Sequence, residues 1–518
     1  MRRFVTFLLA GAGFWLWLTL LVACQVESPR MITLTAQAEA TPTLTAAPVL
    51  LKVETPTLIP GSLATPISGE IYDTVTVWVN ETSPEHAAAL QLMADEFAAA
   101  HQIQVQFQMV MPDLLPELVA TAVLSGTLPD LILHPIEYTV GWANEDIFDA
   151  AATTTVLEQL GLETFDAAAL NLVVTDAGYA ALPAYGWKQI ILYRADRYAA
   201  AGLNPPDSFD NMLAGAETFY DPETLQSGLV VPTEADLLTT QQIFEMLATA
   251  NGCELVDTKG EVFFLHPACL DTLDFYRDII NQYSPSDVQT DISALNAYRE
   301  GRTSFIMASP SVLPIIGGVD PDRAPTCPEC TSADYLARNS GILTAVQGRS
   351  EFAEVGTFSE LTYLGITQQA NSDAAALFAT YWFNEGYLHW LAVNPEQKVP
   401  LRPGTNSNPT AFVDAWPTLP LVANGPTLTE LFGADNAAAL SQNIADSTRW
   451  GFTQGQGQLI THIYQNHLLA ILLQEMLSGY FNTSVAVIEG YKRIIAQIPN
   501  YAYTIPIEPT PTSTPFHR

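Results

Sequence analysis

Two short stretches near the start of the globular part alternate apolar and polar residues. Residues 74–79 read Thr-Val-Thr-Val-Trp-Val, and residues 102–108 read Gln-Ile-Gln-Val-Gln-Phe-Gln. Successive side chains of a strand point to opposite faces, so this alternation predicts two strands, the second with one face in water. Residues 129–133 end in an apolar run of leucine, isoleucine and leucine, and this run predicts a third strand.

Helices are predicted between these strands. Ser83-Pro84 has the residue types of a helix N-cap and first-turn proline, and apolar residues then recur at helical spacing through Phe97. A second helix is expected from about 113 to 124, before a Ser-Gly pair. The order strand–helix–strand–helix–strand predicts the start of a doubly wound α/β sheet.

The rest of the chain continues the α/β pattern without an internal repeat. A second α/β region is expected from about 187 to 350, with its loop-rich part at 310–350. Later elements are a strand over 361–367, a helix over 372–385, and helices over about 461–478 and 484–498, the last capped by Ser484.

The carboxyl ends of the first strands are the candidate ligand site. In open α/β sheets, ligands bind beyond the carboxyl ends of the strands. The loops after Trp78 and Leu133 are therefore candidate site loops on geometry alone.

An apolar run from Phe4 to Ala23 follows the basic pair Arg2-Arg3 and ends at Leu21-Val22-Ala23-Cys24. This layout resembles a lipobox, which predicts a cleaved signal peptide over 1–23, a lipidated Cys24 and an extracytoplasmic, membrane-anchored protein. The alternative is an uncleaved membrane anchor, because the run is nearly long enough to span a bilayer. A Thr/Pro-rich tether over 24–69 and a flexible tail over 501–518 are expected on either side of the globule.

Composition limits the partners. Of 518 residues, 48% are hydrophobic, enough for two or more domains with large cores, and the net charge is −35. Such a surface repels phosphate backbones and anionic lipid headgroups, so nucleic-acid binding is not expected.

Four cysteines remain besides Cys24. An even number in an exported chain predicts two disulfides, Cys253–Cys269 and Cys327–Cys330. A zinc site would need a second close pair, which the sequence lacks. A redox role for Cys327-Pro-Glu-Cys330 stays an alternative, although this motif lies in a Pro-rich stretch.

The sequence carries no motif for catalysis or for a nucleotide. It contains no phosphate-binding glycine loop, no Gly-x-Ser-x-Gly elbow and no carboxylate pair that its pattern singles out. His134 and His266 lie near apolar stretches, where structural roles are favoured for a lone histidine, and no metal or cofactor is predicted. The chain is therefore not expected to be an enzyme.

Aromatic residues suggest a carbohydrate ligand. Trp78 ends the first strand, Trp142 follows the third, and Tyr185-Gly186-Trp187 follows a proline. Aromatic faces pack against the C–H faces of sugars, while amides and carboxylates bind the hydroxyls. A place in the core is the alternative for each, and it is favoured for Trp78.

Several stretches in order resemble the solute-binding lipoproteins of ABC importers, in the group that binds maltodextrin and other sugars. The Ser-Gly-Thr-Leu-Pro-Asp-Leu turn is the most specific of them. The resemblance spans about residues 70 to 400 and rests on residues 75–80, 97–105, 125–131, 182–196, 201–206, 301–305 and 364–383.

The resemblance implies a fold of two α/β lobes joined by a hinge, the type II clamp of periplasmic binding proteins, each lobe with a doubly wound sheet. Lobe one would comprise 70–184 and 351–403, and lobe two 185–350 and 404–500. The clamp would close on one solute, with no bond made or broken.

The resemblance also implies the ligand-binding positions. Trp450 is a further candidate, as an aromatic wall of the site. At one position where sugar binders commonly have a tryptophan, this chain has Ser311. The positions are Asn80, Glu81, Thr82, His134, Glu137, Tyr138, Trp187, Ser309 and Ser311.

The resemblance favours a monomeric receptor that delivers a sugar or oligosaccharide to the permease subunits of an ABC importer. A secreted, lipid-anchored glycosidase is the alternative. A third reading is a receptor that reports its ligand state to a signalling partner without transport.

Overall fold

A computed structural model describes residues 73–447 and 449–499. Every described residue belongs to one compact unit. The predicted signal peptide, Cys24, the tether and the C-terminal tail all lie outside the described residues.

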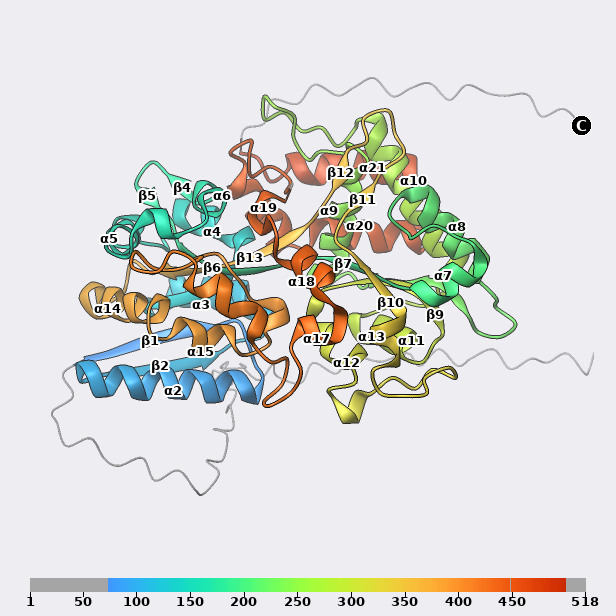
Figure 1. Cartoon of the computed structure of the whole chain (residues 1–518). Coiled ribbons are helices and arrows are strands. Elements are labelled where there is room, and N and C mark those ends of the chain that lie inside the picture. The colour runs from blue at the N-terminus through green and yellow to red at the C-terminus, as the bar shows by residue number, and fades with distance from the viewer. Residues whose placement is uncertain (1–72, 448, 500–518) are drawn as a thin grey trace, which may run out of the picture. The chain divides into compact units, whose positions relative to one another are not determined.

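A mixed six-stranded sheet lies in the part of the unit that carries the chain's first strands (Figure 1). Strand β1 runs parallel to β2 and β3, whereas β13 is antiparallel to β3 and to β6. In spatial order the strands are β14 (Val399–Pro400), β6 (Leu182–Lys188), β13 (Ser359–Ile366), β3 (Leu131–Pro135), β1 (Asp73–Val79) and β2 (Ile103–Met109).

The predicted opening elements are confirmed as β1, α2, β2, α3 and β3. The alternation of β1 buries Val75, Val77 and Val79 completely, and Ser83 caps α2 by accepting a hydrogen bond from the His86 amide at 3.2 Å. Around this sheet lie α2 (Pro84–His101), α3 (Leu115–Ser125), α4 (Ile136–Asn144), α5 (Ala150–Leu160), α6 (Ala167–Asn171), α14 (Ser372–Phe383) and α15 (Tyr387–Leu391).

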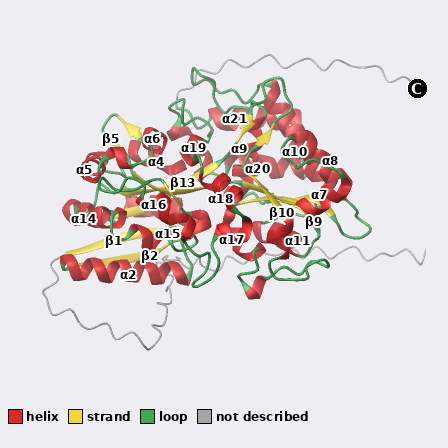
Figure 2. Ribbon diagram, viewed as in Figure 1, coloured by secondary structure: helices red, strands yellow, loops and turns green. Residues whose placement is uncertain are grey.

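A four-stranded sheet organises the other part of the unit. Its spatial order is β10 (Ser340–Leu343), β7 (Ile190–Arg194), β9 (Thr303–Ala308) and β8 (Ser227–Val230). The helices of this region, visible around the sheet in Figure 2, are α7 (Ala195–Ala201), α8 (Phe209–Phe219), α9 (Leu238–Ala250), α10 (Pro267–Tyr283), α11 (Asp291–Arg299), α12 (Leu313–Ile316) and α13 (Tyr335–Asn339).

The chain passes between the two sheets at Gln189. Strand β6 of the larger sheet ends at Lys188, and β7 of the smaller sheet begins at Ile190. A second crossing leads from β10 through the short pair β11 (Val346–Gln347) and β12 (Val355–Gly356) back to β13. These crossings lie side by side, because Ser359 of β13 is the register partner of Lys188.

The C-terminal region is helical. It contains α16 (Ala411–Ala415), α17 (Leu428–Phe432), α18 (Ala434–Ser441), α19 (Gly457–Gln465), α20 (Leu468–Leu477) and α21 (Thr483–Ile495). Helix α19 packs closely on α4, since a Cβ atom at Gly141 would lie 2.3 Å from the Thr461 side chain. The closeness of these backbones depends on glycine.

Two details of the predicted C-terminal helices are wrong. The single helix over 461–478 is broken into α19 and α20 at His467, whose φ of 47° is left-handed and ends the helical path. The last helix is capped by Asn482, not Ser484, because the Asn482 side chain accepts a hydrogen bond from the Val485 amide at 2.9 Å.

Both predicted disulfides are confirmed. Cys253–Cys269 fastens the start of α10 to the loop after α9, and Cys327–Cys330 closes a short turn. Within the described residues, no group of His, Cys, Asp and Glu side chains could hold a metal ion, and no helix is long and apolar enough to cross a membrane.

Candidate ligand-binding site

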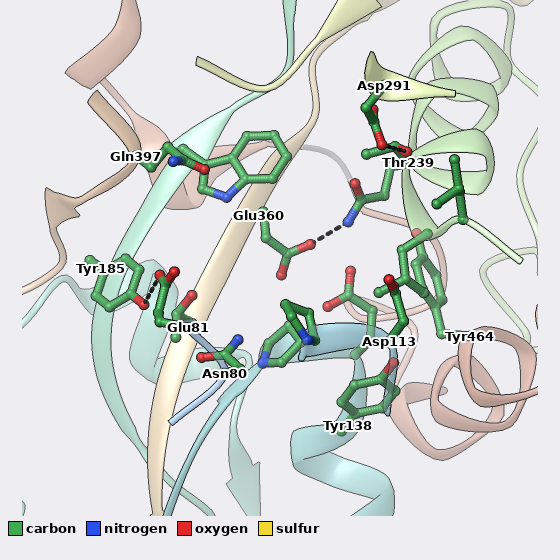
Figure 3. A pocket seen from close by; sticks show the side chains of 18 residues that line it. Asn80, Glu81, Asp113, Tyr138, Tyr185, Thr239, Asp291, Glu360, Gln397 and Tyr464 are labelled. Carbon is green, nitrogen blue, oxygen red and sulfur yellow. Dashed lines mark hydrogen bonds between the residues drawn. The ribbon is translucent and has the colours of Figure 1, made fainter. Parts of the chain in front are cut away.

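A pocket opens between the two sheets. It encloses about 950 Å³ of space, including its open mouth. The larger sheet and its helices supply one wall, and the starts of α9 and α11 supply the other (Figure 3). The lining residues are Asn80, Glu81, Pro112, Asp113, Pro135, Glu137, Tyr138, Tyr185, Trp187, Leu237, Leu238, Thr239, Gln242, Asp291, Glu360, Thr362, Gln397 and Tyr464.

Three parallel strands aim their carboxyl ends at this pocket. Asn80 and Glu81 follow β1, Asp113 follows β2, and Glu137 begins the helix that follows β3. The carboxyl ends of parallel strands meet at one edge of a sheet, where ligands commonly bind. The loops expected from the strand order therefore do face the pocket.

Four aromatic side chains line the pocket. Tyr138 stacks on buried Trp142 with ring centroids 4.9 Å apart, so its ring orientation is fixed from behind. The Tyr185 hydroxyl donates to Glu81 at 3.4 Å. Trp187 on β6 and Tyr464 on α19 complete the set.

Arg449 lies fully behind the pocket and organises its floor. Its guanidinium contacts Glu137 at 2.5 Å and Glu245 at 2.8 Å, and it donates to the Ser359 carbonyl at 2.9 Å. The Tyr464 hydroxyl donates to Glu245 at 2.6 Å, so this cluster also positions a lining residue. Such a buried arginine is satisfied because each of its charged neighbours is hydrogen-bonded to it.

Glu360 lies in the middle of the lining residues in Figure 3. It is only 6% exposed and accepts one hydrogen bond, from the Gln242 amide at 2.8 Å. Burial and the neighbouring carboxylate of Glu137 raise the pKa of Glu360 well above its ordinary value.

A second buried cation stands behind Glu81. The Lys398 ammonium lies 3.6 Å from the Glu81 carboxylate, 2.8 Å from His86 Nε2 and 2.8 Å from the Val393 carbonyl. Burial and the Lys398 charge lower the pKa of His86 to about 3, so its imidazole stays neutral and accepts a hydrogen bond from the ammonium.

Five of the ten predicted ligand positions line this pocket: Asn80, Glu81, Glu137, Tyr138 and Trp187. The other five do not line it.

His134 and Trp450 are held in the core. His134 is fully buried on β3, and its ring nitrogens lie 3.0 Å from the Ile132 carbonyl and 3.0 Å from the Thr139 hydroxyl. Trp450 is 1% exposed, and its indole donates to the Cys253 carbonyl at 2.9 Å. Neither side chain has a polar atom left for a ligand.

The three remaining positions are polar residues outside the lining. Thr82 is exposed beyond the pocket edge, and the hydroxyls of Ser309 and Ser311 pair with each other at 2.7 Å.

Several lining residues were missed by the sequence reasoning. Asp113 follows β2 as Asn80 follows β1, so the strand-end rule could have found it. Glu360 is the one acid in a strand whose eight residues are all buried, and an acid within such an apolar strand could have been recognised as a candidate site residue. Gln242, Asp291 and Tyr464 carry no local signal, because only the packing of distant helices brings them together.

The comparisons with known proteins agree with this geometry. Residues 80–325 match the model of the bacterial extracellular solute-binding protein family. This is the family that the sequence resembles. A relative of the solute-binding protein family in Escherichia coli (strain K12), YcjN, is named as an ABC transporter periplasmic-binding protein and is 26% identical over 288 residues. The match covers 55% of this chain and 62% of that relative's length.

Solved structures of solute-binding proteins share the fold. One from Thermotoga lettingae, bound with α-D-tagatose, has a TM-score of 0.63 at 18% identity and covers 82% of this chain and 100% of its own. A sugar transporter from Arthrobacter chlorophenolicus, with bound laminaribiose, has a TM-score of 0.64 at 13% identity and covers 82% and 99%. The predicted two-lobed α/β clamp of the periplasmic binding proteins is confirmed.

Proposed function

We propose that this chain is the extracytoplasmic receptor of an ABC importer, binding a sugar or oligosaccharide and delivering it to permease subunits. The pocket between the two sheets carries this proposal. Its aromatic side chains, among them Tyr138 and Trp187, stand beside the amide of Asn80 and several carboxylates. Aromatic faces suit the C–H faces of a sugar, and the polar groups suit its hydroxyls.

The relatives support this class of ligand. The proteins with the same fold were solved with tagatose, laminaribiose and maltose, and the Escherichia coli relative is named for an ABC transporter. The lining differs in detail from the positions that the family resemblance implied, so the particular sugar is left to experiment.

Hinge closure would couple binding to delivery. The chain crosses between the sheets at Gln189 and again before Ser359, and a ligand that contacts both walls favours the closed arrangement. The first lobe boundary lies at Gln189 and not at the predicted 184/185, because β6 continues in the larger sheet to Lys188. The boundaries at 350/351 and 403/404 belong to this proposal. A permease that recognises the closed arrangement would engage the loaded receptor.

We further propose that cleavage after residue 23 leaves Cys24 as the lipid anchor, with residues 25–69 as a leash. A tethered receptor meets its permease at a raised effective concentration. Mass spectrometry of the mature N-terminus should find a diacylglyceryl group on Cys24, and Cys24→Ala should release the protein from membranes. An unmodified Cys24 in the membrane fraction would favour the uncleaved anchor instead.

Calorimetric titration of the full chain against a panel of sugars tests the binding proposal. Saturable binding of one sugar, with loss of its uptake in cells that lack the protein, is expected. No binding across sugars, polyamines and phosphoglycerols would overturn the proposal. Turnover of a bound glycan would instead support the glycosidase.

A further inference from the structure

All of the charged side chains that line the pocket are acidic. Five carboxylates line it, and the lining contains no lysine, arginine or histidine among the described residues. The acids are Glu81, Asp113, Glu137, Asp291 and Glu360.

Only two of these carboxylates have a cationic partner. Glu81 is paired with Lys398 and Glu137 with Arg449, both from behind the wall. In the described part of the chain, no ion pair reaches Asp113, Asp291 or Glu360. Asp113 and Asp291 therefore carry charge that no cation of the described residues pairs with, whereas burial and the Glu137 carboxylate raise the pKa of Glu360 and favour its uncharged form, which can still accept hydrogen bonds.

Two deeply buried oxygens of the pocket lack a donor. Oε1 of Glu360 and Oε2 of Glu137 have no hydrogen-bond partner, although these side chains are only 6% and 2% exposed. A buried polar atom without a partner costs about 1–3 kcal/mol. A solute that places N–H donors against both oxygens would recover that cost.

Carboxylates also face one another at the mouth. Asp113 follows β2 and Asp291 is the first residue of α11. Burial raises the pKa of Asp291, and the charge of the nearby Asp113 raises it further. Burial also raises the pKa of Asp113, and the charge of His467 offsets part of that shift. Since these two acids come from opposite walls, a cation between them would favour approach of the walls.

A metal ion does not fit these acids. Within the described residues they form no group with the spacing of a metal site. An organic ammonium does fit, because it offers three N–H donors together with a positive charge.

We infer that the solute carries an ammonium group, seated against Glu360 and Glu137, on a sugar-like body that packs on the aromatic side chains. This inference rests on the proposed function and narrows it to aminated saccharides. A linear polyamine would offer the same ammonium chemistry without the sugar ring, so the test includes one.

Titration calorimetry of the full chain should compare four probes: deacetylated chitobiose, its N,N′-diacetyl form, cellobiose and spermidine. Deacetylated chitobiose is expected to bind at least tenfold more tightly than the two uncharged disaccharides. Equal or tighter binding of an uncharged disaccharide would overturn the inference while leaving the proposed function intact. If spermidine alone binds, the solute carries an ammonium group but is not a saccharide. If none of the four probes binds, the inference is wrong.

Variants test the position of the charge. Glu360→Gln keeps the size of the side chain, and it should weaken the aminated probe at least tenfold while changing cellobiose binding less than threefold. Asp113→Asn, at the exposed mouth, should weaken the same probe several-fold without risk to folding. Glu158→Gln, exposed on α5, is the matched control. Equal losses for charged and uncharged probes, or no loss in either variant, would contradict the proposed seat.

Discussion

Arg449 and Glu137 are 312 residues apart in the chain, and their side chains meet at 2.5 Å behind the pocket. The same guanidinium contacts Glu245 of α9 at 2.8 Å and lies over the Phe358 ring at 4.2 Å. Glu137 belongs to α4 beside the larger sheet, whereas α9 packs on the smaller one. One buried cation therefore joins the two walls beneath the ligand site.

Removal of this cation should be severely destabilising. Arg449→Met would leave Glu137 and Glu245 buried without a counter-charge, and the loss of a partner from a buried pair costs about 3–5 kcal/mol. Urea unfolding measures the difference. Arg493→Met is the matched control, because the Arg493–Glu475 pair at 2.6 Å is half-exposed and its loss should cost less than about 1 kcal/mol. Similar losses in both variants would refute a special role for Arg449.

The same contact explains the limits of the sequence prediction. Local patterns found β1, α2, β2, α3 and β3, because alternation and capping are properties of neighbouring residues. The apolar period continues across His467, so the pattern alone could not show the break between α19 and α20.

Half of the predicted ligand positions line the pocket, because local patterns locate the strand ends but not the contacts between distant segments. Asn80 and Glu137 follow strands that the sequence reveals, and strand ends converge in this type of sheet. Long-range packing alone brings Gln242 and Tyr464 to the pocket and Arg449 to the cluster behind it, and no local pattern encodes that packing. His134 shows the opposite error, since the strand carries it to the correct region but turns its ring into the core.

Trp187 should contribute directly to the binding of a sugar. Trp187→Ala is expected to weaken the best-binding sugar by 10–100-fold, since an aromatic face contributes about 1.5–3 kcal/mol when buried by a ligand. Trp187→Phe should retain most of the affinity. The comparison requires calorimetry at equal folded fractions.

Trp450 provides the matched control for that experiment. Because its side chain is 1% exposed in the core, Trp450→Phe should lower the melting temperature and leave the affinity within about threefold. A larger loss of affinity from Trp450→Phe than from Trp187→Ala would reverse the assignment of these residues.

The two disulfides should differ in their contribution to stability. Cys253–Cys269 closes a loop with a sequence separation of 16, whereas Cys327–Cys330 closes one of 3. Loop entropy then gives about 3 kcal/mol for the first bridge and about 2 kcal/mol for the second.

Paired Cys→Ala variants test this order by chemical denaturation. The Cys253/Cys269 variant should lose more stability, and reduction of both bridges in the unchanged protein should cost at least as much as this variant loses. A greater loss from the Cys327/Cys330 variant would show that native packing outweighs loop length.

Glu396 should make stability depend on pH. It is 1% exposed, and burial raises its pKa to about 7, although nearby hydrogen-bond donors and the Lys398 charge oppose the shift. The folded protein therefore keeps this proton at pH values where the unfolded chain, with the ordinary pKa of 4.5, has lost it.

Stability should accordingly fall as pH rises from about 4.5 to 7, and the penalty should then stay constant. Glu396→Gln removes the ionisable group, so it should stabilise the protein at pH 8 by up to about 3 kcal/mol, because each pKa unit corresponds to about 1.4 kcal/mol. The gain should vanish near pH 4, where both states are protonated. Unfolding curves across this range, with Glu158→Gln on the surface as the control, measure it. A gain that does not change with pH would mean that Glu396 is destabilising for a reason other than its charge.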